Sequence, residues 1–101
     1  MTYATFGFIE AKPGKQDELA ELLSTYNPKL VEAGCLYCVV GISEDEPDKV
    51  LIAELWPSQE AYQAFQKDTG MNKLLSKMRR LITGTTGSTK FVAVGSPLQD
   101  N

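Results

Sequence analysis

The spacing of apolar residues along the chain follows two periods, and each period predicts a different kind of element. Segments rich in aromatic and β-branched residues predict four strands, at residues 3–10, 36–42, 50–56 and 89–94. Between the first two strands, apolar residues recur three or four positions apart. This spacing predicts a helix whose buried stripe consists of Leu19, Leu22, Leu23, Tyr26 and Leu30.

Proline, glycine and serine residues mark the ends of the predicted helices. Pro28 lacks a backbone N–H and clashes with the preceding turn, so we expect the first helix to kink or break near Asn27. Ser58 is a candidate N-cap for a second helix. Gly70 interrupts that helix, and residues 71–82 then predict a third amphipathic stretch.

The resulting order is β-α-β-β-α-(α)-β, which is typical of a ferredoxin-like split βαβ fold. We therefore predict an α+β domain with a four-stranded antiparallel sheet and helices on one face. The segment 84–87, Gly-Thr-Thr-Gly, is expected to connect the last helix to the last strand. It is not a phosphate loop, because such loops run from a strand into a helix.

The predicted second and third strands are apolar on both faces. Residues 36–40 and 50–53 lack the polar alternation of a sheet with one solvated face. Because the helices can cover only one face, we predict that a second copy of the chain covers the other, in a homodimer. The alternative is that loops of the same chain cover that face.

Length and composition fit one globular domain. The chain has 101 residues, of which 43% are hydrophobic and 23% charged. We expect a single domain over residues 1–101, with a core at about 3–94 and a polar, frayed tail at 95–101. The net charge of −3 disfavours nucleic acid as a partner. One basic cluster exists and is interpreted as a solvated helix face: Lys73, Lys77, Arg79 and Arg80.

Neither a membrane span nor a signal peptide is expected. No segment approaches the roughly 20 apolar residues that cross a bilayer, and residues 1–4 do not open a basic and then apolar leader. We therefore expect a cytoplasmic protein without a membrane partner, in which both cysteines stay reduced.

The chain has no histidine, which removes the commonest general base and a common metal ligand. Cys35 and Cys38 form a C-x-x-C at the start of a predicted strand, whereas redox pairs of this kind sit at a helix N-terminus. We interpret them as buried structural thiols. With only two cysteines and no histidine, a zinc site is not expected either.

Three segments of the sequence resemble the antibiotic biosynthesis monooxygenase family. Residues 8–15 (FIEAKPGK) resemble its first strand and turn, and residues 32–36 (EAGCL) resemble its "EPGCL" entry into the second strand. Residues 54–61 (ELWPSQEA) resemble its "E-x-W-x-S-x-E-A" stretch. The order and spacing of these segments extend the resemblance over about residues 3–94.

The resemblance implies a dimeric α+β barrel with a pocket between the sheet and the helices of each subunit. Family members include cofactor-independent oxygenases of phenols and quinols, haem-degrading enzymes, and proteins of unknown role. Many members carry histidines where this chain has Phe65 and Gly70. Because the haem-degrading branch needs a histidine ligand, the resemblance implies no haem, and we expect neither a cofactor nor a metal.

Aromatic and polar residues near the predicted pocket are candidates for ligand contacts. Trp56 ends a strand and can donate its indole N–H, and the tyrosines can act as phenol donors. The candidate catalytic residues are Trp56, Tyr37, Tyr62 and Asn72, and the candidate substrate-binding residues are Phe6, Phe65, Met71 and Arg79. For each of them, packing or a solvated surface position is the alternative interpretation.

Two functions follow from these observations. The first is a cofactor-independent monooxygenase of a small aromatic substrate, in which the deprotonated phenol itself reduces O₂. The second is a non-catalytic module that binds a small ligand or only assembles. The aromatic residues favour the first and the missing histidine favours the second.

Overall fold

The computed structural model of the chain describes residues 1–98, so the last three residues of the predicted tail lie outside the described part. The elements are β1 (Tyr3–Ala11), α1 (Gln16–Ser24), α2 (Pro28–Glu32), β2 (Tyr37–Ile42), β3 (Lys49–Trp56), α3 (Gln59–Gln66), the 3-10 turn η1 (Thr69–Met71), α4 (Asn72–Arg79) and β4 (Ile82–Val92).

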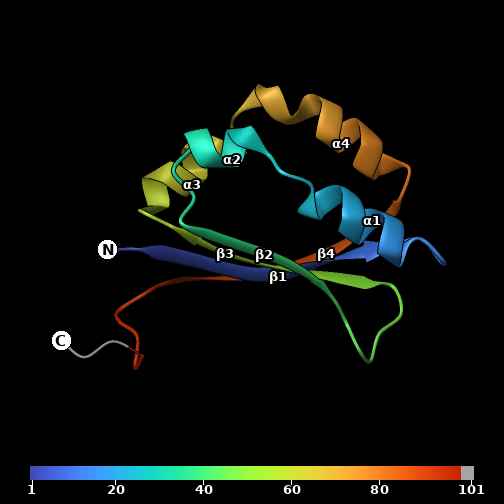
Figure 1. Cartoon of the computed structure of the whole chain (residues 1–101), viewed down its shortest axis with the longest axis horizontal. Coiled ribbons are helices and arrows are strands. Elements are labelled where there is room, and N and C mark those ends of the chain that lie inside the picture. The colour runs from blue at the N-terminus through green and yellow to red at the C-terminus, as the bar shows by residue number, and fades with distance from the viewer. Residues whose placement is uncertain (99–101) are drawn as a thin grey trace.

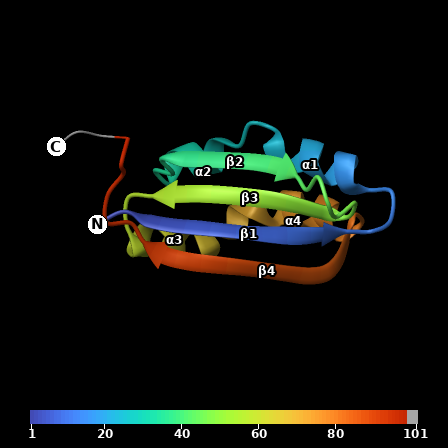
Figure 2. The same cartoon turned by 90° about the horizontal axis from the view of Figure 1, so that it is seen from below.

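The four strands form one antiparallel sheet in the order β2-β3-β1-β4. All four helices lie on one face of this sheet (Figure 1), and the view from below shows the other face bare (Figure 2). The predicted α+β, ferredoxin-like fold is confirmed. The sheet of the single chain is open, with β2 and β4 as its edges.

Local side-chain chemistry begins α2 and α3 where the sequence predicts. α1 stops at Ser24, and α2 starts at Pro28, so the expected kink is a complete break. The side chain of Asn27 caps α2 by accepting a hydrogen bond from the Lys29 N–H at 3.0 Å. Ser58 caps α3 in the same way, accepting from the Ala61 N–H at 3.1 Å.

The prediction of a connector at residues 84–87 is wrong, because the last strand already begins at Ile82. Pairing with β1 holds this glycine- and threonine-rich segment extended despite its weak strand propensity. Gly84 has φ +100° near a register shift between β1 and β4, a conformation that favours glycine. A Cβ on Gly87 would lie only 2.6 Å from the Phe8 ring, so a larger residue at this position would force that ring to move.

The third amphipathic stretch is shorter than predicted. Its helix, α4, ends at Arg79, and Ile82 already belongs to β4. The apolar period continues past the helix because Leu81 and Ile82 pack against the same core as Met78. The apolar spacing thus predicted correctly that Leu81 and Ile82 face the core, although these two residues are not part of the helix.

The aliphatic core lies between the sheet and α1 and α4. Its buried members are Ala11, Leu19, Val50, Met78 and Leu81. Leu19 and Val50 have no exposed surface, so each contributes the full stabilisation of a buried side chain, about 1.5–3 kcal/mol. In the described part of the chain, none of the helices has the length and apolar character that a bilayer span requires.

The bare face of the sheet is apolar as well. The strand register places Phe6 of β1 beside Ala53 of β3 and Thr89 of β4 on this face, with Val39 of β2 next in the row. Four large apolar residues of this face are between 49% and 59% exposed: Phe6, Tyr37, Val39 and Phe91. We call these four residues the open-face patch.

Candidate functional site

A hydrogen-bonded carboxylate lies on the helix-covered face of the sheet. The register pairs Thr5 of β1 with Glu54 of β3, and Trp56 lies two residues further along β3, on the same face. The Trp56 Nε1–H donates to Glu54 Oε1 at 3.0 Å, and the Thr5 hydroxyl donates to the same oxygen at 3.2 Å. A carboxylate has about four acceptor sites, so the second oxygen can accept from a ligand.

Aromatic side chains pack around Trp56, which donates to this carboxylate. Trp56 has no exposed surface. Its ring lies 5.2 Å from the Phe65 ring and 5.8 Å, edge-on, from the Tyr62 ring, and Tyr62 also contacts Tyr3 at 5.4 Å. Such offset and edge-on pairs stabilise beyond their buried area. Trp56 is thus a core residue whose N–H orients Glu54.

A groove of about 200 Å³ opens beside this carboxylate, between the sheet and α3. We call it the Glu54 groove. Thr5, Glu54 and Tyr62 line it from one side, and Thr86 and Ser88 of β4 from the other. A cavity of about 150 Å³ holds a benzene molecule. The Glu54 groove therefore has room for a small aromatic compound beside hydroxyl and carboxylate groups.

The environment of Glu54 keeps neighbouring acids protonated. Burial, then the charge of Glu54, then Tyr3 raise the pKa of Tyr62, so its phenol stays a hydrogen-bond donor at neutral pH. Partial burial, Glu54 and Cys35 raise the pKa of Cys38 to about 11. Burial, followed by the charge of Glu54, also raises the pKa of Cys35, although hydrogen bonds to the Tyr37 and Leu55 carbonyls oppose the shift.

Both cysteines are free thiols, as expected. Cys35 is half-buried, but Cys38 is exposed, so the interpretation of both as buried is wrong for Cys38. The reason is its position on β2, an edge strand that the short helix α2 covers incompletely. Among residues 1–98, no group of three or more Cys, Asp or Glu residues is placed to hold a metal ion.

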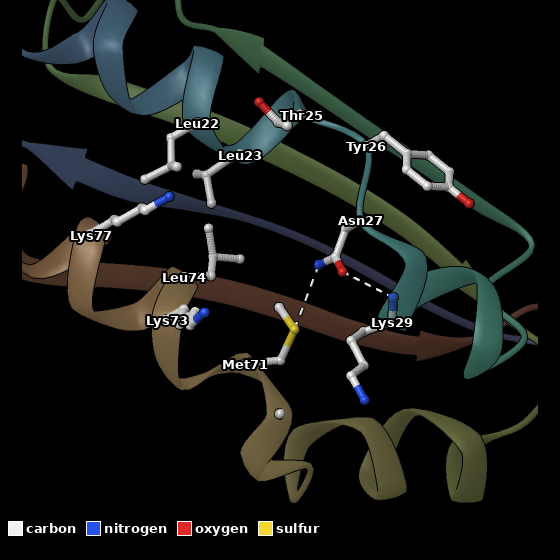
Figure 3. Close-up of a pocket in the computed structure, with 11 residues that line it drawn as sticks. Leu22, Leu23, Thr25, Tyr26, Asn27, Lys29, Met71, Lys73, Leu74 and Lys77 are labelled. Atoms are coloured by element: carbon white, nitrogen blue, oxygen red, sulfur yellow. Dashed lines mark hydrogen bonds between the residues drawn. The ribbon is translucent and has the colours of Figure 1, made fainter.

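A second hollow, of about 240 Å³, lies within the helix layer, between the end of α1, the segment before α2, and α4. We call it the helix-layer pocket. Figure 3 shows its leucines from α1 and α4 facing one another, with lysines around them. The Asn27 amide Nδ2 points to Met71 Sδ at 3.5 Å across this hollow. It shares no lining residue with the Glu54 groove.

The predicted site residues do not form one cluster. Trp56, Tyr62 and Phe65 lie together at the Glu54 groove. Tyr37 and Phe6 belong to the open-face patch, on the other side of the sheet. Met71 lines the helix-layer pocket, and Asn72 and Arg79 are exposed on α4. The roles assigned to all eight residues stay predictions.

The sequence interpretation did not include Glu54 and Thr5 among the candidates. A signal for Glu54 was available, because Glu54 and Trp56 are two residues apart in one strand and must share a face. A carboxylate on the helix-covered face of a strand needs a donor, and a Trp N–H is the nearest one. Thr5 had no comparable signal, because its proximity depends on the register between β1 and β3.

Comparison with known proteins identifies the family to which this chain belongs. The family model for antibiotic biosynthesis monooxygenase matches residues 2–75. A proposed antibiotic biosynthesis monooxygenase from Chloroflexus aurantiacus is 27% identical with a TM-score of 0.69, covering 95% of this chain and 98% of that one. No curated protein matches the chain.

Two further solved structures share the fold at lower identity. SnoaB, a cofactor-independent oxygenase from Streptomyces nogalater, is 12% identical with a TM-score of 0.78, over 97% of this chain and 98% of its own. A proposed antibiotic biosynthesis monooxygenase from Deinococcus radiodurans is 21% identical with a TM-score of 0.76, over 93% and 94%. The chain belongs to the antibiotic biosynthesis monooxygenase family.

Proposed function

We propose that this protein is a cofactor-independent monooxygenase of small phenol- or quinol-type aromatics, and that the reaction takes place in the Glu54 groove. The observation that carries the proposal is the Glu54 carboxylate, fixed by two donors at the side of an aromatic-lined groove. Family membership supports the reaction class.

Glu54 is the proposed acceptor of the substrate's hydroxyl proton. Its Oε1 already accepts from Trp56 and Thr5, so the substrate hydroxyl donates to Oε2. An ordinary phenol has a pKa near 10 and an ordinary glutamate one of about 4.3, so a carboxylate deprotonates such a phenol only to a small extent. We therefore expect substrates whose hydroxyl is acidified by a conjugated carbonyl group.

The reaction needs no electron donor besides the substrate. Proton transfer to Glu54 gives an electron-rich phenolate, which transfers electrons to O₂ and then forms a C–O bond with it. Loss of water leaves a quinone-type carbonyl: one oxygen atom enters the product, the other becomes water, and the substrate supplies all four electrons. Tyr62, kept protonated by its surroundings, donates a hydrogen bond to the developing oxygen anion.

A homodimer is part of the same proposal. The open-face patch presents four large apolar side chains that no element of the described chain covers, and monomers rarely expose such continuous apolar surface. Pairing two sheets through these faces would close the barrel expected from the sequence. We also propose a cytoplasmic location, where the free thiols Cys35 and Cys38 stay reduced.

The decisive experiment supplies ¹⁸O₂ and a panel of mono- and bicyclic phenols and quinols, with and without a conjugated carbonyl. We expect one O₂ consumed per substrate and one ¹⁸O atom in the product. Glu54→Gln, which keeps the shape and both hydrogen bonds, should lower kcat about 100-fold. Equal turnover by wild type and Glu54→Gln would contradict the role of Glu54.

A non-catalytic ligand-binding module is the second candidate, and one observation favours it. The chain has no histidine, so it lacks the commonest general base. Saturable binding of the panel compounds without any O₂ consumption would decide for this candidate against the oxygenase.

A further inference from the structure

The charge around the helix-layer pocket differs from that of the whole chain. The chain carries a net charge of −3, yet Lys29, Lys73 and Lys77 line this pocket, and none of its eleven lining residues is acidic. Lys29 is 3.8 Å from Glu32, a distance typical of a weak exposed pair. Lys73 and Lys77 are in none of the ion pairs found among residues 1–98. The lining of this hollow is therefore positive, and the acidic neighbours of its lysines among the described residues lie outside the lining: Glu32 beside Lys29, and Glu18, which lines a separate hollow with Lys77.

The interior of the same pocket is apolar. Leu22 and Leu23 of α1 face Leu74 of α4, and Lys77 extends from α4 toward the two α1 leucines (Figure 3). A ligand that fits must carry an apolar body together with its negative charge. A bare inorganic anion would leave the leucines without a partner.

Asn27 adds an oriented donor to the pocket. Its Oδ1 is occupied by the cap of α2, where it accepts from the Lys29 N–H. Among residues 1–98, the acceptor found for its Nδ2 is Met71 Sδ at 3.5 Å, and a thioether is a weak acceptor. The amide can thus donate to a ligand oxygen while it continues to cap the helix.

We propose that the helix-layer pocket binds a small amphiphilic organic anion. The apolar body lies against Leu22, Leu23 and Leu74, and the carboxylate, or another anionic oxygen group, lies between Lys73, Lys77 and the Asn27 amide. The volume of about 240 Å³ is below the roughly 300 Å³ at which pockets for drug-sized ligands begin. A ligand of one or two rings therefore fits best.

Lysine suits such a site without selecting one kind of anion. Its ammonium group is a compact point charge, whereas an arginine fork selects a planar carboxylate or phosphate. The proposed site shares no lining residue with the Glu54 groove, so it stands whether or not the protein is an oxygenase.

The test compares binding of 2-naphthoate and of its neutral counterpart 2-naphthamide by calorimetry at low salt. We expect 2-naphthoate to bind at least three times more tightly. Lys73→Gln combined with Lys77→Gln should weaken 2-naphthoate binding about fivefold, since each change removes one solvent-screened attraction to the carboxylate, and should change 2-naphthamide binding less than twofold. The matched control, Lys12→Gln with Lys67→Gln, removes the same charge outside the pocket and should have little effect.

Asn27→Asp is a second variant, which tests the pocket without removing either lysine. The aspartate keeps the oxygen that caps α2 but places a negative charge in the pocket, so 2-naphthoate binding should fall more than that of 2-naphthamide. Methyl resonances of Leu22, Leu23 and Leu74 should shift on titration. Equal affinity for the two compounds, or shifts confined to the Glu54 groove, would overturn the proposal.

Discussion

The two faces of the sheet are built from the same strands but are completed in different ways. On the helix-covered face, odd-numbered β1 residues and their β3 partners meet α1, α3 and α4 and form an aliphatic core at one end and the Glu54 groove at the other. On the other face, the open-face patch meets nothing within the described chain. Apolar character thus identifies both faces as surfaces to be covered, but it does not say what covers them.

The largest expected effect lies in the aliphatic core of the helix-covered face. Leu19 is fully buried and contacts residues of the sheet and α4, so Leu19→Ala should lower the free energy of unfolding by about 2–5 kcal/mol through lost burial and a cavity. Urea denaturation measures the change. Leu75→Ala, at a helix position that is 44% exposed, is the control and should cost far less.

Changing the support of Glu54 should affect turnover more than stability. Trp56→Phe keeps most of the ring packing but removes the Nε1–H donor. We expect about a tenfold lower kcat and a loss of about 1–2 kcal/mol in unfolding free energy, as for a buried group that loses its partner. Thr5→Val removes the other donor and should lower kcat by a similar factor. Unchanged turnover in both variants would remove the positioning role.

A charge introduced into the open-face patch should dissociate the proposed dimer, whereas the same charge on an exposed helix should not. Val39→Glu inserts a carboxylate into the open-face patch, so we expect the proposed dimer to dissociate at micromolar concentration, as measured by light scattering. Val31→Glu is the matched control, because Val31 is 62% exposed on α2, in the helix layer and not on the bare face of the sheet. A monomeric wild-type protein at that concentration would contradict the dimer directly.

The smallest effect concerns Cys38, which shares the helix-covered face with Glu54. With a pKa raised from 9.0 to about 11, its thiol stays protonated at pH 8. Its alkylation should therefore be roughly 10- to 100-fold slower than in the unfolded chain. The rate should rise steadily from pH 8 toward pH 11. Glu54→Gln removes a negative charge that raises this pKa, so that variant should react a few-fold faster, as followed by mass spectrometry.

The sequence was most informative where local chemistry decides the structure. The Pro28 break, the Ser58 cap and the strand order follow from spacing and turn residues. It was least informative where distant segments meet. Residues 84–87 form a strand because β1 pairs with them, and Thr5 reaches Glu54 because of the register between β1 and β3. No window of the sequence around either segment contains that information.

The pairing of β1 with β4 also determines when this domain can fold. Tyr3 pairs with Val92, so the sheet joins residues near opposite ends of the chain, and such high contact order slows folding. During synthesis, β1 lacks one neighbour until the last strand has emerged, and its apolar residues stay exposed to other nascent chains until then. A chain ending at Leu81 should therefore be sensitive to protease, whereas one ending at Leu98 should be resistant.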